Sequence, residues 1–123
     1  MLSRLVTVTT ISTAGIVSYA AAEVAGGLIL RDCNGAGRAD TVPTAAALLA
    51  VIPGAQVGQA VRFTIRNTSG GATSITVSTN TGVTLSGTMT IAQNNSKDFL
   101  AVFTNVTAAS EAYTLYSLGT VVF

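Results

Sequence analysis

The sequence predicts an all-β, single-domain protein of the β-sandwich or jelly-roll class that contains one short helix. Its 123 residues fit one compact domain. From residue 59 onward, apolar and polar residues alternate in short runs that are separated by turns rich in Gly, Asn and Ser. Short strands at a spacing of about 8 to 12 residues are typical of β-sandwiches. Only one segment, at about residues 43–52, has the pattern of a helix.

The first 27 residues are expected to form an N-terminal arm or attachment segment, and residues 28–123 the β-sandwich domain. The run LVTVTTI alternates like a strand, whereas the small residues that follow it favour neither helix nor strand. Two interpretations remain open. The segment is an arm that contacts a neighbouring subunit through Leu5, Val6, Val8 and Ile11, or it is an ordinary first strand and turn.

The predicted helix at about residues 43–52 has recognisable start and stop residues. Asp40 or Thr41 is placed to cap it, and Pro43 suits its first turn. A Pro-Gly pair at 53–54 ends it. The helix carries no charged side chain, so it must be buried against the sheet, another subunit, or both. Leu48 and Leu49 are therefore candidate contacts with a partner.

The remaining strands follow from period-two alternation. In AVRFTIRNT, the apolar side chains Val61, Phe63 and Ile65 share one face of the strand, and the polar side chains share the other. Four later segments are also predicted as strands: TSITVST, VTLSGTMTIAQNN, SKDFLAVFTNV and EAYTLYSLGTVVF. The apolar end of the last one, 121–123, is either an edge strand that pairs with a neighbour or the ordinary last strand of the sheet. Its residues are further candidate contacts: Val121, Val122 and Phe123.

The residue types needed for most catalytic and metal sites are missing. The chain has no histidine, which excludes Ser-His-Asp and Cys-His nucleophilic sites and histidine-based metal sites. Its one cysteine, Cys33, has no disulfide partner and no histidine base. Asp32 and Asp40 flank one loop, as a glycosidase pair would. The alternative is that Asp40 caps the helix and Asp32 pairs with Arg31 or Arg38. We expect no enzyme activity, no cofactor and no metal.

The charge content indicates the kind of partner. Charged residues make up 9% of the chain, and the net charge is +1. The basic residues are scattered, so neither nucleic acid nor an anionic membrane is an expected partner. No apolar run reaches the roughly 18 to 20 residues of a membrane helix. A small domain with so few charges resists aggregation poorly unless its surface is covered, which favours self-association.

Several segments carry a resemblance to a known group of proteins. They are Arg31-Asp32, the run DTVPTAA at 40–46, IPGA at 52–55, FTIRN at 63–67 and FTNVT at 103–107. Together they make residues 28–123 similar to small virion structural proteins of tailed bacteriophages. These proteins are trimeric β-sandwich modules that serve as capsid cement (decoration) proteins or as heads of capsid or tail fibres. The first 27 residues lie outside the resemblance.

The resemblance implies a homotrimer on the capsid surface of a virion, made in the host cytoplasm, with the major capsid protein and copies of itself as partners. In such a family residues 28–123 would be the trimerising domain. A cement protein is favoured because 123 residues leave no room for a fibrous shaft and residues 1–27 contain no heptads. The alternative is a fibre head, a knob that binds a receptor.

Overall fold

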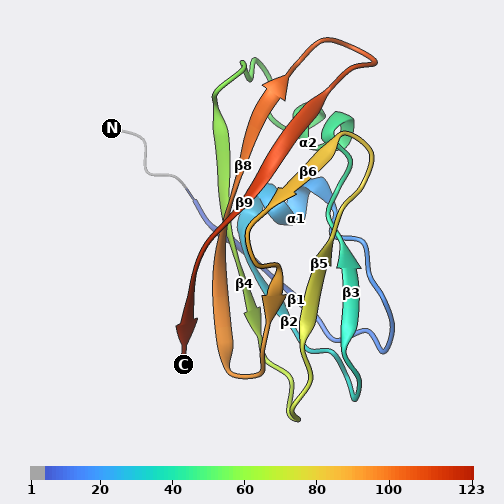
Figure 1. The fold of residues 1–123 in the computed structure, drawn as a ribbon, viewed down its shortest axis with the longest axis vertical. Coiled ribbons are helices and arrows are strands. Elements are labelled where there is room, and N and C mark those ends of the chain that lie inside the picture. Colours follow the sequence, from blue (N-terminus) through green and yellow to red (C-terminus); the bar gives the residue numbers. More distant parts are fainter. Residues whose placement is uncertain (1–4) are drawn as a thin grey trace.

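The fold consists of two β-sheets and two short helices, as seen in a computed structural model that describes residues 5–123 (Figure 1). The larger sheet has the strand order β1-β2-β4-β8-β9-β6, and the smaller has the order β3-β5-β7. In chain order the elements are β1 (Thr7–Ile11), α1 (Ala21–Gly26), β2 (Gly27–Arg31), β3 (Arg38–Thr41), α2 (Ala45–Ala50), β4 (Ala60–Asn67), β5 (Ile75–Ser78), β6 (Val83–Ser86), β7 (Thr90–Ile91), β8 (Asn95–Asn105) and β9 (Ala112–Val122). The predominantly β character predicted from the sequence is confirmed.

One hydrophobic core lies between the two sheets. The alternation predicted for β4 is present, since Val61, Phe63 and Ile65 are buried and point toward the smaller sheet's Ile75 and Ile91. The ring of Phe63 stacks on that of Phe99 in β8, with centroids 5.3 Å apart. Such aromatic pairs add to the stability that burial of the rings provides.

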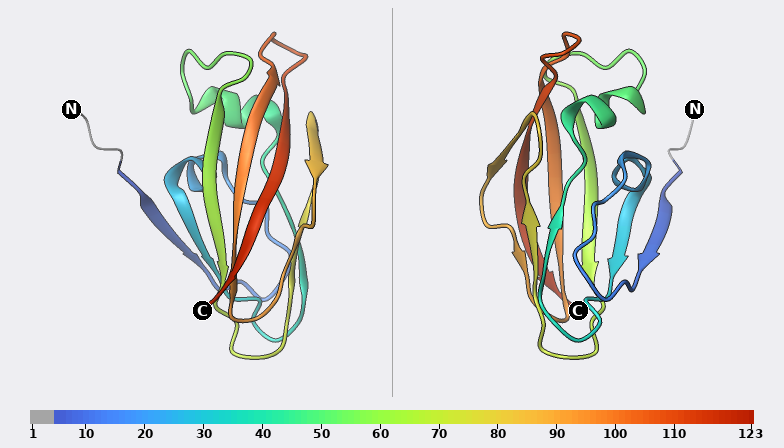
Figure 2. Two further views of the ribbon diagram at one scale, coloured as in Figure 1. Left: turned by 60° about the vertical axis from the view of Figure 1, so that its left-hand side comes forward. Right: turned by 90° about the vertical axis from the view of Figure 1, so that its right-hand side faces the viewer.

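Four of the seven strand pairings in the described chain are parallel, which the sequence analysis did not anticipate. β1 pairs with β2, β2 with β4, β3 with β5, and β6 with β9 in this way. Parallel neighbours cannot be joined by a tight hairpin and need a crossover. Between β1 and β2 the crossover contains α1, a second helix that the sequence analysis did not predict (Figure 2).

Helix α1 is short and begins without a capping side chain. At its start the carboxylate of Glu23 accepts a hydrogen bond of 2.7 Å from the backbone N–H of Ala20. At its end Gly27 adopts φ 103°, a left-handed conformation that favours glycine, and the chain turns directly into β2. Val24 of this helix is buried in the core.

Helix α2 forms inside the predicted range of 43–52, but its cap differs from the prediction. Thr44 rather than Asp40 or Thr41 is the N-cap, and its hydroxyl accepts a hydrogen bond of 3.1 Å from the N–H of Ala47. Pro43 precedes the cap, and its carbonyl accepts a hydrogen bond of 2.7 Å from the hydroxyl of Tyr113 in β9. This bond fixes the start of α2 against the larger sheet.

The segment before residue 28 contributes to the same core. Tyr19 and Val24 are each 1% exposed, and Val17 packs against the core. The backbone of residues 17–19 also bonds to Thr41 at the edge of β3. The boundary drawn at residue 27 therefore does not separate an arm from a complete core, and a deletion of residues 1–27 would remove core side chains. Neither helix of the described residues is long enough to cross a membrane.

Candidate interaction surface

Exposed apolar side chains are concentrated in two segments of the chain. Eight of the eleven large apolar side chains that are exposed among residues 5–123 lie in the segments 5–8 and 116–123. They are Leu5, Val6, Val8, Tyr116, Leu118, Val121, Val122 and Phe123. Neither segment contains a charged residue. Apolar surface gathered in this way marks a site of interaction with another macromolecule.

Both segments belong to the larger sheet and are joined across its outer face, the face turned away from the core. Residues directly opposite each other on paired strands share a face. One such row runs Val8, Leu28, Thr64, Asp98, Gly119 from β1 to β9, and the next runs Thr10, Leu30, Arg66, Ser96, Val121. The outer face is therefore one continuous surface, and the half-buried leucines of β2 lie on it between β1 and β4.

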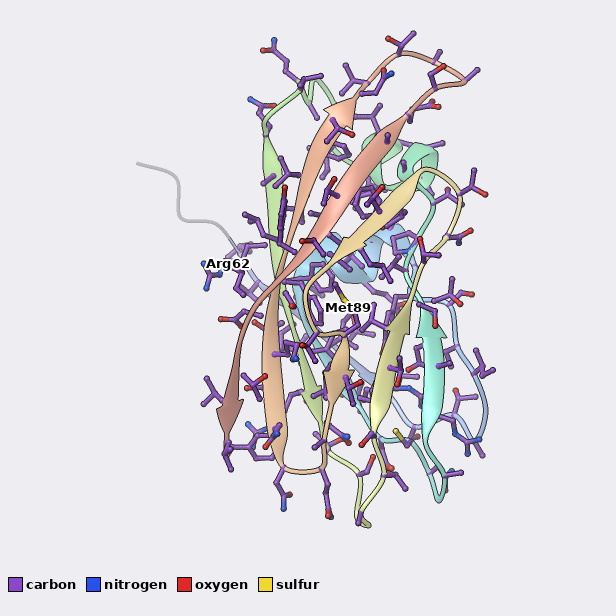
Figure 3. The ribbon with its side chains drawn as sticks, viewed as in Figure 1. Arg62 and Met89 are labelled. Carbon is purple, nitrogen blue, oxygen red and sulfur yellow. The ribbon has the colours of Figure 1, made fainter. Side chains whose placement is uncertain are left out.

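The outer face carries few charges. Arg62 of β4 forms an ion pair of 3.0 Å with Asp98 of β8, and both side chains are exposed. Figure 3 shows Arg62 pointing away from the sheet, whereas Met89 lies between the sheets. Because Asp98 neutralises Arg62, the net charge of this surface is small. A partly apolar face of small net charge favours a protein partner over nucleic acid.

A shallow hollow lies beside β1 on the same sheet. It is lined by Val6, Gly27, Arg62, Phe63 and Thr64. The hollow exists because the ladder between β2 and β4 begins only at Leu28, which leaves the level of Arg62 without a β2 neighbour. Its lining mixes apolar side chains with one arginine, and it is continuous with the apolar segment at residues 5–8.

The nine predicted contact residues divide into two groups in the structure. Leu5, Val6 and Val8 are exposed, and Val121, Val122 and Phe123 are exposed at the other end of the sheet. The remaining three contact their own chain: Ile11 and Leu49 pack against the core, and Leu48 is fully buried in it. The uncharged face of α2 is thus covered by the core of the same chain, so Leu48 is not available to a partner.

Sequence reasoning missed the contribution of the outer face to this surface. Tyr116 and Leu118 were not among the predicted contacts, although both are more than 40% exposed. Their alternation with buried Tyr113 and Leu115 was visible in the sequence. The strand pairing shifts in register at Leu118, between the pairs Asp98–Gly119 and Phe99–Ser117. This shift could not be predicted from the sequence, because a β-bulge has no reliable sequence pattern.

The two candidate catalytic carboxylates have separate structural roles. Asp40 is fully buried and binds Arg31 at 2.7 Å, so its carboxylate is not accessible to a substrate from solvent. Asp32 instead accepts a hydrogen bond of 2.8 Å from the backbone N–H of Asn34 in the following turn. The predicted helix cap by Asp40 and the predicted pairing of Asp32 with Arg31 or Arg38 are both wrong, because Arg31 pairs with Asp40 and Arg38 donates to the backbone carbonyls of Cys33 and Asn34.

This buried pair organises the chain between β1 and β3. Arg31 donates to Asp40 and also to three backbone carbonyls, those of Thr13, Gly15 and Asp32. Burial lowers the pKa of Arg31, but the hydrogen bond and the charge of Asp40 outweigh burial and raise it overall. A buried charge that is this fully bonded is a structural element, and it holds the segment after β1 in place.

Asp40 is also bonded from the opposite side. The hydroxyl of Tyr19 donates to it at 2.8 Å, and the backbone N–H of Val17 donates at 3.1 Å. Burial raises the pKa of Tyr19 above its ordinary value of 10.0, and the neighbouring charge of Asp40 raises it further. Burial likewise raises the pKa of Tyr113. Both tyrosines are therefore held neutral in the folded state.

The two buried tyrosines make the fold sensitive to alkaline pH. Their folded-state pKa values are raised, so the stability they contribute is present below pH 10 and is lost as the pH rises, because only the unfolded chain ionises. We expect the free energy of unfolding to fall by about 1.4 kcal/mol per pH unit for each tyrosine above that pH. The measurement is chemical denaturation between pH 10.5 and 11.5, above the ordinary lysine pKa of 10.5, where the lowered pKa of buried Lys97 no longer opposes the trend.

The matched variants are Tyr19→Phe, Tyr113→Phe and Tyr116→Phe. Each of the first two should lower the slope of the free energy against pH by about half. Tyr116 is 42% exposed, so its variant should keep the slope of the original chain. Equal slopes in all four proteins would show that burial of the two hydroxyls does not control the alkaline transition.

Comparison with protein-family models, with curated proteins and with solved structures finds no match to this chain. Among residues 5–123, no three His, Cys, Asp or Glu side chains gather in a way that would hold a metal ion.

Proposed function

We propose that the chain is a structural protein of a virion, a capsid cement protein that binds the shell of major capsid protein as a homotrimer. One observation carries the proposal: a β core with two uncharged, exposed apolar segments at opposite edges of one sheet. The resemblance of residues 28–123 to phage decoration and fibre-head modules supplies the particular assembly. The β-sandwich or jelly-roll class is part of the proposal, and two sheets around one core support it.

Self-association would remove the exposed apolar segments from water. A closed cyclic assembly buries the exposed apolar segments of every copy at once. Each copy that bridges two or three capsid subunits adds its binding energy to the free energy needed to separate them. A protein of this kind needs no catalytic group, and shape and hydrogen bonding can replace charge at its contacts.

We place the attachment function within the first 27 residues at the exposed segment that precedes and enters β1. Leu5, Val6 and Val8 are available there, whereas Tyr19 and Val24 are committed to the core. Substitution of the three exposed residues by Ser is therefore a better test of attachment than deletion of the whole segment. The expected result is a folded protein that no longer binds its particle.

The proposal is tested by quantitative mass spectrometry of particles purified from the source of the sequence. We expect the chain in intact virions, at a copy number that is a substantial fraction of that of the major capsid protein. Particles assembled without it should release their genome at a lower temperature. A few copies per virion would support the fibre head in place of the cement protein. Absence from purified virions would contradict both.

A further inference from the structure

Several strand edges have no strand beside them in the part of the chain that the structure describes, and two of them can accept a second copy: β1 and the free end of β9. β3 is covered at one end by residues 17–19, β7 has only two residues, and the edge strand β6 has only four. β1, by contrast, is a five-residue edge strand that pairs only with β2. β9 pairs with β6 only as far as Tyr116, so its last six residues have a free edge (Figure 1).

The outward groups of β1 can be identified from one hydrogen bond. The carbonyl of Ile11 accepts a bond of 2.8 Å from the N–H of Asp32, which continues β2, so the backbone groups of Ile11 face β2. In a parallel pair, the N–H and C=O of one residue face the same side, and successive residues alternate. Those of Val8 and Thr10 therefore face away from the sheet.

The same argument identifies the outward groups of β9. The N–H of Phe123 donates to the carbonyl of Asn94 at 2.7 Å, on the side of β8. By alternation, Val121 and Gly119 also face β8. The backbone groups of Thr120 and Val122 therefore face away from it. Each free edge thus offers two residues with unpaired N–H and C=O groups.

Neither edge has the usual protection against pairing. Native edge strands are kept apart by charged side chains, by proline, by shortness or by a covering segment. Residues 5–11 and 117–123 contain no charge and no proline, and they hold seven of the large apolar side chains that are exposed among the described residues. Edges of this composition are stable in water when another strand covers them.

We propose that β1 of one copy pairs in parallel with the free end of β9 of the next copy, which continues the larger sheet from subunit to subunit around a closed trimer. This rests on the proposed self-association and names the surface responsible. The two edges are complementary in their backbone hydrogen-bonding groups and in the direction of their side chains. With Thr10 opposite Val121, the N–H of Thr10 donates to the carbonyl of Thr120, and its C=O accepts from the N–H of Val122. Thr10 and Val121 already share the outer face of the sheet.

A second copy in this orientation is the occupant that the two edges fit. β1 and β9 run in the same direction in one sheet, since both are parallel to β4. Rotation about an axis along the strands therefore brings β1 of one copy beside β9 of the next in parallel. An antiparallel β1–β1 contact would leave the β9 edge of both copies uncovered. Pairing of unlike edges closes into a ring and leaves neither the β1 edge nor the β9 edge uncovered.

Proline at an outward N–H tests the ladder without disturbing the subunit. Thr10→Pro and Val122→Pro each remove one donor that faces away from the sheet, a position that edge strands tolerate. Thr10→Ala and Val122→Ala are the matched controls, because they remove the same side chains and keep the N–H. Sedimentation equilibrium should show subunit association weakened about tenfold or more by each proline and by less than threefold in each alanine control. Far-UV circular dichroism checks that all four variants are folded.

Cysteine pairs test the register. Cα atoms on neighbouring strands lie about 5 Å apart, within the range of a disulfide. The double variant Thr10→Cys with Val121→Cys should form a covalent trimer under mild oxidation, visible on a non-reducing gel. Thr10→Cys with Val122→Cys, on opposite faces, should remain mostly uncrosslinked. The native Cys33 is fully buried and does not interfere.

The outcomes separate this inference from the proposed function. A wild-type trimer whose prolines weaken association and whose 10–121 pair crosslinks supports both. A wild-type trimer unaffected by either proline, or covalent dimers from Thr10→Cys alone, overturns the β1–β9 contact and leaves self-association intact. A wild-type monomer overturns self-association itself, and the contact with it.

Discussion

Asp40→Asn is expected to lower the free energy of unfolding by about 3–5 kcal/mol, because it leaves the charge of Arg31 buried without a counter-charge. Both side chains of this pair are 0% exposed. Asparagine keeps the shape of aspartate, so the loss reports the charge and the altered hydrogen bonds of Tyr19 and Val17 rather than a cavity. Denaturant unfolding near pH 7 is the measurement.

The exposed pair Arg62–Asp98 is the matched control for this effect. Its side chains are 61% and 36% exposed, so water already solvates both charges. Arg62→Gln should therefore cost less than about 1 kcal/mol. If both variants lowered the free energy of unfolding by the same amount, burial would not be the reason why the Arg31–Asp40 pair contributes to stability.

Phe63→Ala is expected to lower the free energy of unfolding by about 3–5 kcal/mol, through lost burial and the cavity left behind. Phe63 is 1% exposed and stacks on Phe99 between the two sheets. Phe63 lies opposite Phe99 within the ladder between β4 and β8, so on this side the site has little freedom to collapse. An unchanged denaturation midpoint would mean that the inward face of β4 is misassigned.

Phe123→Ala makes the same chemical change at a surface position. Phe123 is 45% exposed, and its ring lies 3.6 Å from the guanidinium carbon of Arg66. Loss of this cation–π contact should cost about 0.5–1 kcal/mol. Both phenylalanine variants are compared at a protein concentration low enough that association does not add to the measured stability.

The elements predicted best were those specified by local pattern. β4 and β8 each bury every second residue, and such alternation can be recognised in the sequence alone. α2 was located by its stop at Pro53 and by its run of alanine and leucine. Its cap was misplaced because Asp40, Thr41 and Thr44 are all suitable capping residues, and only the tertiary structure commits Asp40 elsewhere.

The features that were missed depend on contacts between distant segments. Helix α1 has no capping side chain and few residues, so it forms because a crossover must connect two parallel strands. The Arg31–Asp40 pair joins the end of β2 to β3. The sequence positions of these residues do not distinguish this pair from a pair between Arg31 and Asp32. Leu48 was predicted as a contact with a partner because an uncharged helix does not reveal which of its faces meets its own core.

The low charge of the chain connects these observations to its proposed role. With 9% charged residues, the chain uses one arginine and one aspartate to build its interior and pairs another two on its outer face. Few charges remain to keep separate copies apart in water. The two exposed apolar segments are uncharged, lie at two sheet edges, and can form hydrogen bonds along both.

The most direct test is the mass of the untagged wild-type protein in solution, measured by sedimentation equilibrium over a range of concentrations. We expect a species of three times the 12.4 kDa of one chain, which dissociates only on dilution. A single chain that remains monomeric and soluble at the highest concentration would contradict self-association as the basis of the protein's function.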